Sequence, residues 1–228
     1  MPSERALRRE VALANVILER FGLSGAFGHA SARLGSSNTF LIPTRRSPGL
    51  ADARHMLVLD AEGKKVSGIG EPNSEFWIHA RLYAARADVG GVVHAHPPAC
   101  VCLTQIGEPH RVVHNQGGPF FRGVPEYSRI GLVHTRALGD ALARSLGRGL
   151  AVMMRGHGIT TAAADLRTAT VAALFLEESA ALQLRMLAAA GGDAARIRVF
   201  TREEALRVSD QLGPRIVERA WDYFSRRS

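Results

Sequence analysis

Three histidines in two short apolar segments are the residues of this chain best suited to hold a metal ion. His94 and His96 end an apolar segment that Pro97 stops. Because side chains two apart in a strand point the same way, these two imidazoles would project from one face. His157 follows a second apolar segment, 151–154, and is flanked by glycines. Three imidazoles leave open positions on a divalent ion, which is typical of a catalytic site. For the first pair alone, two hydrogen-bonded structural histidines are the alternative.

A carboxylate that could act beside such an ion lies at a predicted helix start. Pro72, Asn73 and Ser74 precede Glu75, and this pattern is typical of a helix N-terminus, with Ser74 as the cap and Glu75 in the first turn. The helix is expected to run to about Ala87. Three histidines and a carboxylate at a strand–helix edge favour a catalytic metal. A histidine-only ligand set accepts zinc, manganese, cobalt or iron.

Taken together, three motifs resemble the class II aldolase/adducin family: Ser74-Glu75, His94-x-His96 and Gly156-His157-Gly158. The likeness covers nearly the whole chain. It implies a three-layer αβα fold with a central, mostly antiparallel sheet. It also implies one divalent metal ion per chain on the three histidines, with Glu75 as the catalytic acid/base. A homotetramer with active sites at subunit interfaces is the expected assembly.

Two departures from the sugar-phosphate aldolases of this family lie on the substrate side. Those aldolases carry Gly-Asn-x-Ser where this chain has Gly28-His29-Ala30-Ser31, so His29 replaces an asparagine that helps to hold phosphate. Arg45 and Arg46 fall where a Ser-Gly-rich phosphate loop is expected. A guanidinium meets a flat carboxylate with two parallel hydrogen bonds, although phosphate also accepts arginine. A surface position is the alternative for His29 and for either arginine.

Segment 28–33 and the later His114-Asn115-Gln116 resemble the family branch that decarboxylates ortho-hydroxy aromatic dicarboxylates, of the dihydroxyphthalate or hydroxypyridine dicarboxylate type. The resemblance implies a metal-dependent carbon–carbon lyase in which Glu75 or His29 delivers the proton. The candidates for contact with the substrate are Ser31, Arg33, Arg45, Arg46, Ser74 and Tyr127, the last as a loop residue reaching in from a neighbouring subunit. The alternatives are a class II aldolase for a sugar phosphate, a non-haem iron oxygenase and a non-catalytic scaffold.

Composition limits the other classes of function. The 228 residues, 46% of them hydrophobic, predict one globular domain spanning 1–228. No apolar run approaches the ~20 residues of a membrane span, and the charged first 20 residues lack a signal-peptide core, so a cytoplasmic protein without a membrane partner is expected. The net charge is +8, but Lys64 and Lys65 are the only lysines among 29 scattered basic residues. This pattern predicts no nucleic-acid partner and suits a small anionic substrate.

The periodicity of apolar residues predicts the remaining elements. Helices are expected at 3–21, 75–87, 98–105, 135–146 and 166–190, with one or two more within 201–224. Strands are expected at 28–34, as an edge of the sheet, and at 39–42, 56–60, 64–66, 90–96, 111–115 and 151–157. Residues 125–127 are expected in a loop, and Cys100 and Cys102 as reduced thiols in the core.

Overall fold

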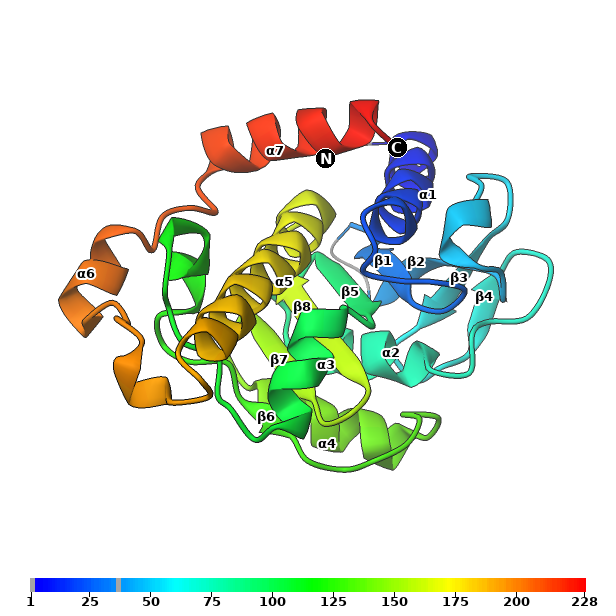
Figure 1. The fold of residues 1–228 in the computed structure, drawn as a ribbon. Helices are drawn as coiled ribbons and strands as arrows, with labels where there is room; N and C mark the ends of the chain where they lie inside the picture. The colour runs from blue at the N-terminus through cyan, green and yellow to red at the C-terminus, as the bar shows by residue number, and fades with distance from the viewer. Residues whose placement is uncertain (1–2, 36–37) are drawn as a thin grey trace.

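The computed structural model describes residues 3–35 and 38–228, which form a layered structure around one sheet of eight strands (Figure 1). The strand order is β4-β3-β2-β1-β5-β8-β7-β6. Every neighbouring pair is antiparallel except β6 and β7, so the prediction of a mostly antiparallel sheet is confirmed. The strands are β1 (His29–Arg33), β2 (Thr39–Pro43), β3 (Met56–Asp60), β4 (Lys65–Ser67), β5 (Gly91–Ala95), β6 (Glu126–Tyr127), β7 (Ala151–Met154) and β8 (Gly158–Ala163).

Helices cover both faces of this sheet and enclose a separate apolar core on each side. One core packs α1, α3, α5 and α7 against residues such as Ala30 and Val93, and the other packs α2 and α4 against Phe40 and Val92 (Figure 1). Val92 and Val93 face opposite cores because strand side chains alternate. The three-layer αβα prediction is therefore confirmed. The helices are α1 (Glu4–Arg20), α2 (Phe76–Ala85), α3 (Pro98–Gln105), α4 (Arg136–Leu146), α5 (Leu166–Ala189), α6 (Arg202–Arg207) and α7 (Pro214–Arg226), with short 3-10 turns at 48–50, 115–120 and 194–196. In the described residues, we find no helix that combines the length and the apolar character needed to cross a bilayer.

The start of α2 differs from the prediction. Thr135 and Asp165 cap α4 and α5 through their side chains, as expected for these residue types. In α2, however, Glu75 itself occupies the cap position, with no side-chain cap. The Asn73 side chain instead accepts the Glu75 N–H at 3.2 Å. The prediction of Ser74 as the cap is therefore wrong, and Glu75 lies just before the first turn rather than in it.

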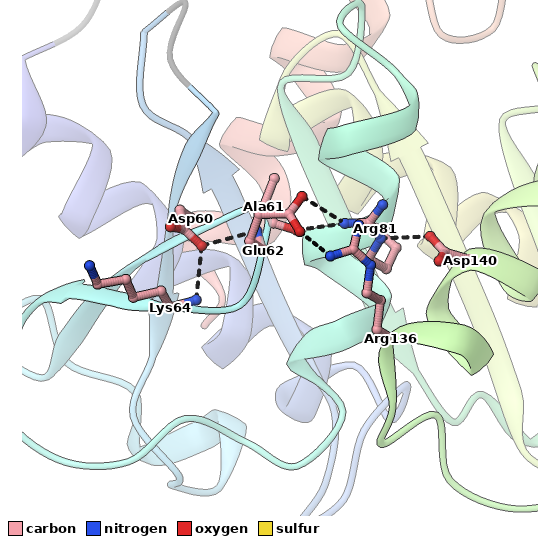
Figure 2. Close-up of polar contacts among 7 residues, drawn as sticks. All are labelled: Asp60, Ala61, Glu62, Lys64, Arg81, Arg136 and Asp140. Atoms are coloured by element: carbon pink, nitrogen blue, oxygen red, sulfur yellow. Dashed lines mark hydrogen bonds and ion pairs between the residues drawn. The ribbon is translucent and has the colours of Figure 1, made fainter.

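A polar network fastens α2 to the hairpin between β3 and β4 and to α4 (Figure 2). The Arg81 side chain, 12% exposed, donates from Nε to Asp140 Oδ1 at 2.6 Å and from one terminal nitrogen to the Ala61 carbonyl at 2.9 Å. Glu62 pairs with both Arg81 and Arg136. Because three elements meet at one guanidinium, α2 has a fixed orientation relative to the sheet.

Four further expectations are corrected by the structure. The strand over 28–34 is β1, which lies in the middle of the sheet between β2 and β5 rather than at its edge. Segment 111–115 is not a strand, since its backbone bonds to the Gln183 side chain and to Phe200. Residues 126–127 are a strand, because they pair in parallel with β7. Cys100 is buried, but Cys102 is exposed rather than in the core.

Candidate metal centre

Glu75, His94, His96 and His157 come together at the end of β5, where each offers one ligand atom and all four atoms lie within 4.8 Å of one another. The Nε2 atoms of His94 and His96 are 3.1 Å apart. One Glu75 oxygen, Oε2, lies 3.5 Å from His94 Nε2 and 3.6 Å from His157 Nε2. The structure thus brings together the four residues that the sequence singled out.

The strand pairing of β5 and β8 sets the direction of the His94 ring. His94 is fully buried, and its Nδ1 lies 3.0 Å from the carbonyl oxygen of Ile159 on β8. Since a carbonyl can only accept, Nδ1 carries the proton and Nε2 presents its lone pair to the cluster. His96 lies one residue beyond the end of β5. Burial lowers its pKa to about 3, so its ring is neutral, the form that binds a metal ion.

His157 owes its position to the glycines on both sides, in the turn between β7 and β8. Gly156 has a φ of +63°, which favours glycine. At Gly158, a Cβ atom would lie 2.1 Å from the Ala95 carbonyl oxygen and 3.0 Å from the His96 ring. The absence of a side chain at Gly158 therefore lets the turn approach β5 closely enough for His157 to reach the cluster.

The spacing of the donors fits a divalent ion. Two nitrogen ligands with bonds of about 2.0–2.1 Å and angles near 90–110° lie roughly 2.8–3.4 Å apart. The 3.1 Å between the Nε2 atoms of His94 and His96 falls in this range. Two neutral ring nitrogens with facing lone pairs repel each other unless a cation or a proton lies between them. The donor set therefore suits a metal ion with at least one position left for another ligand.

Glu75 completes the cluster and is held from both sides. Its Oε1 accepts the Val133 backbone N–H at 2.8 Å, while Oε2 faces the histidines. Burial disfavours its charge, but contacts with His157 and His94 and the Val133 N–H outweigh burial and hold the Glu75 pKa well below its usual range. The carboxylate is therefore ionised and positioned at the cluster.

A cavity of about 560 Å³ opens onto this cluster. Arg45 and Arg46 line one side, on a loop tied to the segment before α2 by an Arg45 N–H bond to the Glu71 carbonyl, 2.9 Å long. Neither arginine has an ion-pair partner in the part of the chain that the structure describes. Phe27 and Leu132, 72% and 53% exposed, add apolar surface to the lining. The cavity thus combines the cluster of histidines and Glu75, guanidinium groups without an ion-pair partner among the described residues, and apolar contacts.

Not every predicted substrate residue reaches this cavity. His29, Arg45, Arg46 and Ser74 line it, as does Glu75. Ser31 and Arg33 do not line it, so the structure does not place these two residues at the predicted substrate contact. Ser31 is fully buried and bonds to other side chains, and the Arg33 guanidinium donates to the carbonyls of Val89, Tyr83 and Arg86.

Tyr127 lies on β6, away from this cavity, and is 3% exposed. Its hydroxyl group has no hydrogen-bond partner among the described residues. A role at a neighbouring subunit's site stays a prediction. His114 bonds to Gln116, and His134 to the Leu132 carbonyl, and neither belongs to the cluster.

Sequence reasoning missed several residues of the site. Phe27, Leu132 and Asn73 line the cavity, and Val133 contributes only a backbone N–H, which leaves no mark in a sequence. His79 lies behind His29, with His79 Nε2 and His29 Nδ1 2.6 Å apart. In the helix predicted over 75–87, its spacing of four residues from Glu75 places the two on one face, which was the available signal.

Comparison with known proteins agrees with this geometry. Residues 9–184 match the model of the class II aldolase and adducin N-terminal domain family. The chain is 34% identical to a 3,4-dihydroxyphthalate decarboxylase of Arthrobacter keyseri over 81% of this chain and 80% of that protein. It is 31% identical to the enzyme of the same name from Rhodococcus jostii, over 74% and 75%. A 5-methylthioribulose-1-phosphate/5-deoxyribulose-1-phosphate aldolase of Rhodospirillum rubrum is 32% identical, over 82% and 85%.

Solved structures match the fold. An aldolase II superfamily protein from Pseudomonas syringae superposes with a TM-score of 0.85 at 23% identity, over 99% of this chain and 93% of the other. An L-fuculose 1-phosphate aldolase from Glaciozyma antarctica gives 0.81 at 18% identity, over 98% and 88%. From the family match and the relatives above 30% identity, the chain belongs to the class II aldolase and adducin family. Class II aldolases are metal-dependent lyases, in keeping with the histidine cluster.

Proposed function

We propose that this chain is a divalent-metal-dependent carbon–carbon lyase that decarboxylates an ortho-hydroxy aromatic dicarboxylate. The observation that carries the proposal is the shared cavity: the histidine cluster and two unpaired arginines line the same space, with apolar side chains beside them. The similarity to two 3,4-dihydroxyphthalate decarboxylases supports the same reaction. A flat dianion with a hydroxyl group beside one carboxylate matches all three parts of this lining.

The two ends of the cavity would hold the two ends of such a substrate. Arg45 and Arg46 offer forked N–H donors to the carboxylate that is retained. Phe27 and Leu132 contact the ring and exclude water from its faces. The hydroxyl group and the departing carboxylate then point to the cluster. A divalent ion on His94, His96 and His157 would supply a Lewis acid for these two oxygens.

Proton transfer falls to Glu75. Its ionised carboxylate accepts the proton of the substrate hydroxyl group on binding, and Val133 keeps Oε1 in place meanwhile. Glu75 then returns this proton to the ring carbon that bears the departing carboxylate, while the deprotonated hydroxyl oxygen takes on carbonyl character and the ring loses its aromaticity. The bond between that carbon and the carboxyl carbon breaks, carbon dioxide leaves, and the electron pair of the bond makes the ring aromatic again, with hydrogen in place of the carboxyl group. The Glu75 carboxylate is thereby restored for the next cycle.

Aldol cleavage of a sugar phosphate is the second candidate, because the Rhodospirillum rubrum aldolase is 32% identical over 82% of this chain. A metal centre with a carboxylate would serve both reactions, since in each the electrons of the broken carbon–carbon bond are delocalised toward a substrate oxygen that a Lewis acid would stabilise. The two arginines also accept phosphate. We favour decarboxylation because His29 stands where the family's phosphate-binding asparagine is expected.

The test is anaerobic incubation of the metal-loaded protein with two panels of substrates: hydroxylated phthalates with pyridine dicarboxylates, and ketose 1-phosphates. We expect carbon dioxide from the first panel, lost in His94→Ala. We expect Arg45→Gln combined with Arg46→Gln to raise KM for a dicarboxylate by about 10-fold or more, but not for the matching ortho-hydroxy monocarboxylate. Dihydroxyacetone phosphate from the second panel alone would establish an aldolase instead. A product formed only after oxygen is admitted would establish an oxygenase.

A further inference from the structure

A chain of buried polar side chains runs from the cavity into the core between β1 and α2. His29 Nδ1 lies 2.6 Å from His79 Nε2, and His79 Nδ1 lies 2.6 Å from Ser31 Oγ. Ser31 Oγ lies 2.9 Å from the Tyr83 hydroxyl oxygen. All four residues are at most 3% exposed. They meet because His29 and Ser31 alternate along one face of β1, while His79 and Tyr83 lie one helical turn apart on α2.

The far end of this chain determines which way its hydrogen bonds point. Burial raises the Tyr83 pKa well above its usual range, so the phenol keeps its proton. Among the described residues, the only hydrogen-bond acceptor for that proton is Ser31 Oγ. The reverse direction would bury the phenol proton without an acceptor, which disfavours it by roughly 10- to 100-fold. Tyr83 therefore donates to Ser31.

The direction of this hydrogen bond then determines the direction of each following one. The Ser31 hydroxyl, whose oxygen accepts from Tyr83, donates its own proton to His79 Nδ1. The neutral His79 ring must carry its proton on Nε2, and this N–H donates to His29 Nδ1. His29 is thereby left with its own proton on Nε2. Since His29 lines the cavity and its Nδ1 is occupied, this Nε2–H is the group that remains for a ligand.

We propose that Tyr83, Ser31 and His79 are positioning residues that fix His29 as a neutral N–H donor to an anionic oxygen of the substrate. That His29 donates to the substrate rests on the proposed decarboxylase function. Its tautomer follows from the buried hydrogen bonds between Tyr83 and His29 alone. A neutral donor strengthens its hydrogen bond as charge builds on the substrate oxygen. A His29 ring with its proton already on Nε2 cannot act as a base there. Glu75 is then the group that moves the proton, and His29 holds the substrate.

The first measurement concerns the tautomer and needs neither metal nor substrate. In the metal-free full chain labelled with ¹⁵N-histidine, the His29 signals are assigned by their loss in His29→Asn. We expect a protonated Nε2 and an unprotonated Nδ1. Tyr83→Phe and Ser31→Ala remove the source of direction, and we expect both tautomers in each. Thr161→Val is the matched control, because it removes a buried hydroxyl group that donates to the Ala169 carbonyl and takes no part in the row of hydrogen bonds from Tyr83 to His29. A proton on Nδ1 in the unaltered protein would overturn the proposal.

The second measurement separates positioning from mere structure. In the metal-loaded protein, we expect Tyr83→Phe and Ser31→Ala to lower kcat by about 10- to 100-fold for a dicarboxylate that the unaltered protein decarboxylates. This factor corresponds to the free energy of one hydrogen bond to a charged group. KM should change less, and Thr161→Val should keep both values. Mixed tautomers with unchanged kcat would refute the positioning role. If the Nε2–H tautomer is found but no dicarboxylate is turned over, the proposed reaction fails while the assignment of the tautomer stands.

Discussion

Replacing Glu75 with glutamine isolates the proton-transfer role from the shape of the site. The glutamine carbonyl can still accept the Val133 N–H, a bond of 2.8 Å to Oε1 in the structure. The free energy of unfolding should therefore change by less than about 1 kcal/mol. The amide nitrogen would take the place of Oε2, 3.5 Å from His94 Nε2 and 3.6 Å from His157 Nε2. With the three histidines intact, the metal should remain, although the lost charge should weaken its binding by about 10- to 100-fold.

Turnover in Glu75→Gln should fall by about 10²–10⁴, since an amide cannot accept and return the proton. This corresponds to roughly 3–5 kcal/mol of barrier. The assay is carbon dioxide release at saturating metal, with the metal content of each sample measured. Glu218→Gln, which removes an exposed carboxylate on α7, is the matched control and should keep full activity. Undiminished turnover in metal-saturated Glu75→Gln would refute the proton-transfer role of Glu75 and show that another group transfers the proton.

Three further outcomes are expected. His94→Ala and His157→Ala should each lose nearly all bound metal in elemental analysis, and His134→Ala should keep it; full occupancy in both ligand variants would contradict the site. Gly158→Ala should weaken metal binding by at least about 10-fold, because its Cβ would lie 2.1 Å from a β5 carbonyl oxygen and push the turn away. Burial lowers the His110 pKa to about 4, so the unfolded chain takes up this proton first and stability falls as the pH drops from about 6.5 to about 4. His110→Gln should remove on the order of 3 kcal/mol of that dependence in urea titrations.

The residues of the candidate metal centre could be predicted to lie together because their signals are local. Pro97 follows His96 just past the end of β5, and the glycines around His157 mark a turn where the backbone comes close to a neighbour. The beginning of α5 was also readable, because Asp165 has one role there, accepting the Thr168 N–H at 2.8 Å. In each case, the residue type and its immediate neighbours determine the outcome.

The position of β1 was not predictable on this basis. Its alternation of polar and apolar residues is typical of a strand with one face in water. In the structure, the polar face meets a buried row of hydrogen-bonding groups, including Ser31 bonded to His79 and Tyr83. The alternation shows which side chains need hydrogen-bond partners, but it does not show whether those partners are water or other protein groups. The same ambiguity made Ser31 a predicted substrate contact.

The predictions of a Ser74 cap within 72–75 and of a strand over 111–115 were wrong for a related reason. Ser74 has a suitable side chain for a cap, but Asn73 takes the Glu75 N–H and leaves Ser74 on the cavity. The Val-Val run at 112–113 suits a strand, yet the Arg111 N–H before it donates to the Gln183 side chain on α5, and the Val112 carbonyl accepts the Phe200 N–H. Competition between possible partners decided both cases: between two adjacent side chains in the first, and with distant segments in the second. A single sequence does not show which partner is chosen.

His29 and His79 each supply the buried hydrogen-bond partner of the other, and a further prediction concerns their effects on stability. His29→Asn, which restores the residue expected in phosphate-binding relatives, would leave His79 Nε2 without its partner, now 2.6 Å away. His79→Phe would in turn leave His29 Nδ1 and the Ser31 hydroxyl group without their partner. Within the pair of rings, each single change strands one buried nitrogen at a cost of about 1–3 kcal/mol, whereas the double change removes both nitrogens. The loss at Ser31 is the same in His79→Phe and in the double change. The effects on the free energy of unfolding should therefore be non-additive by at least about 1 kcal/mol in metal-free protein. Additivity within about 0.5 kcal/mol would show that the two rings are not coupled. With coupling, converting this cavity to phosphate binding requires a change on α2 as well as on β1.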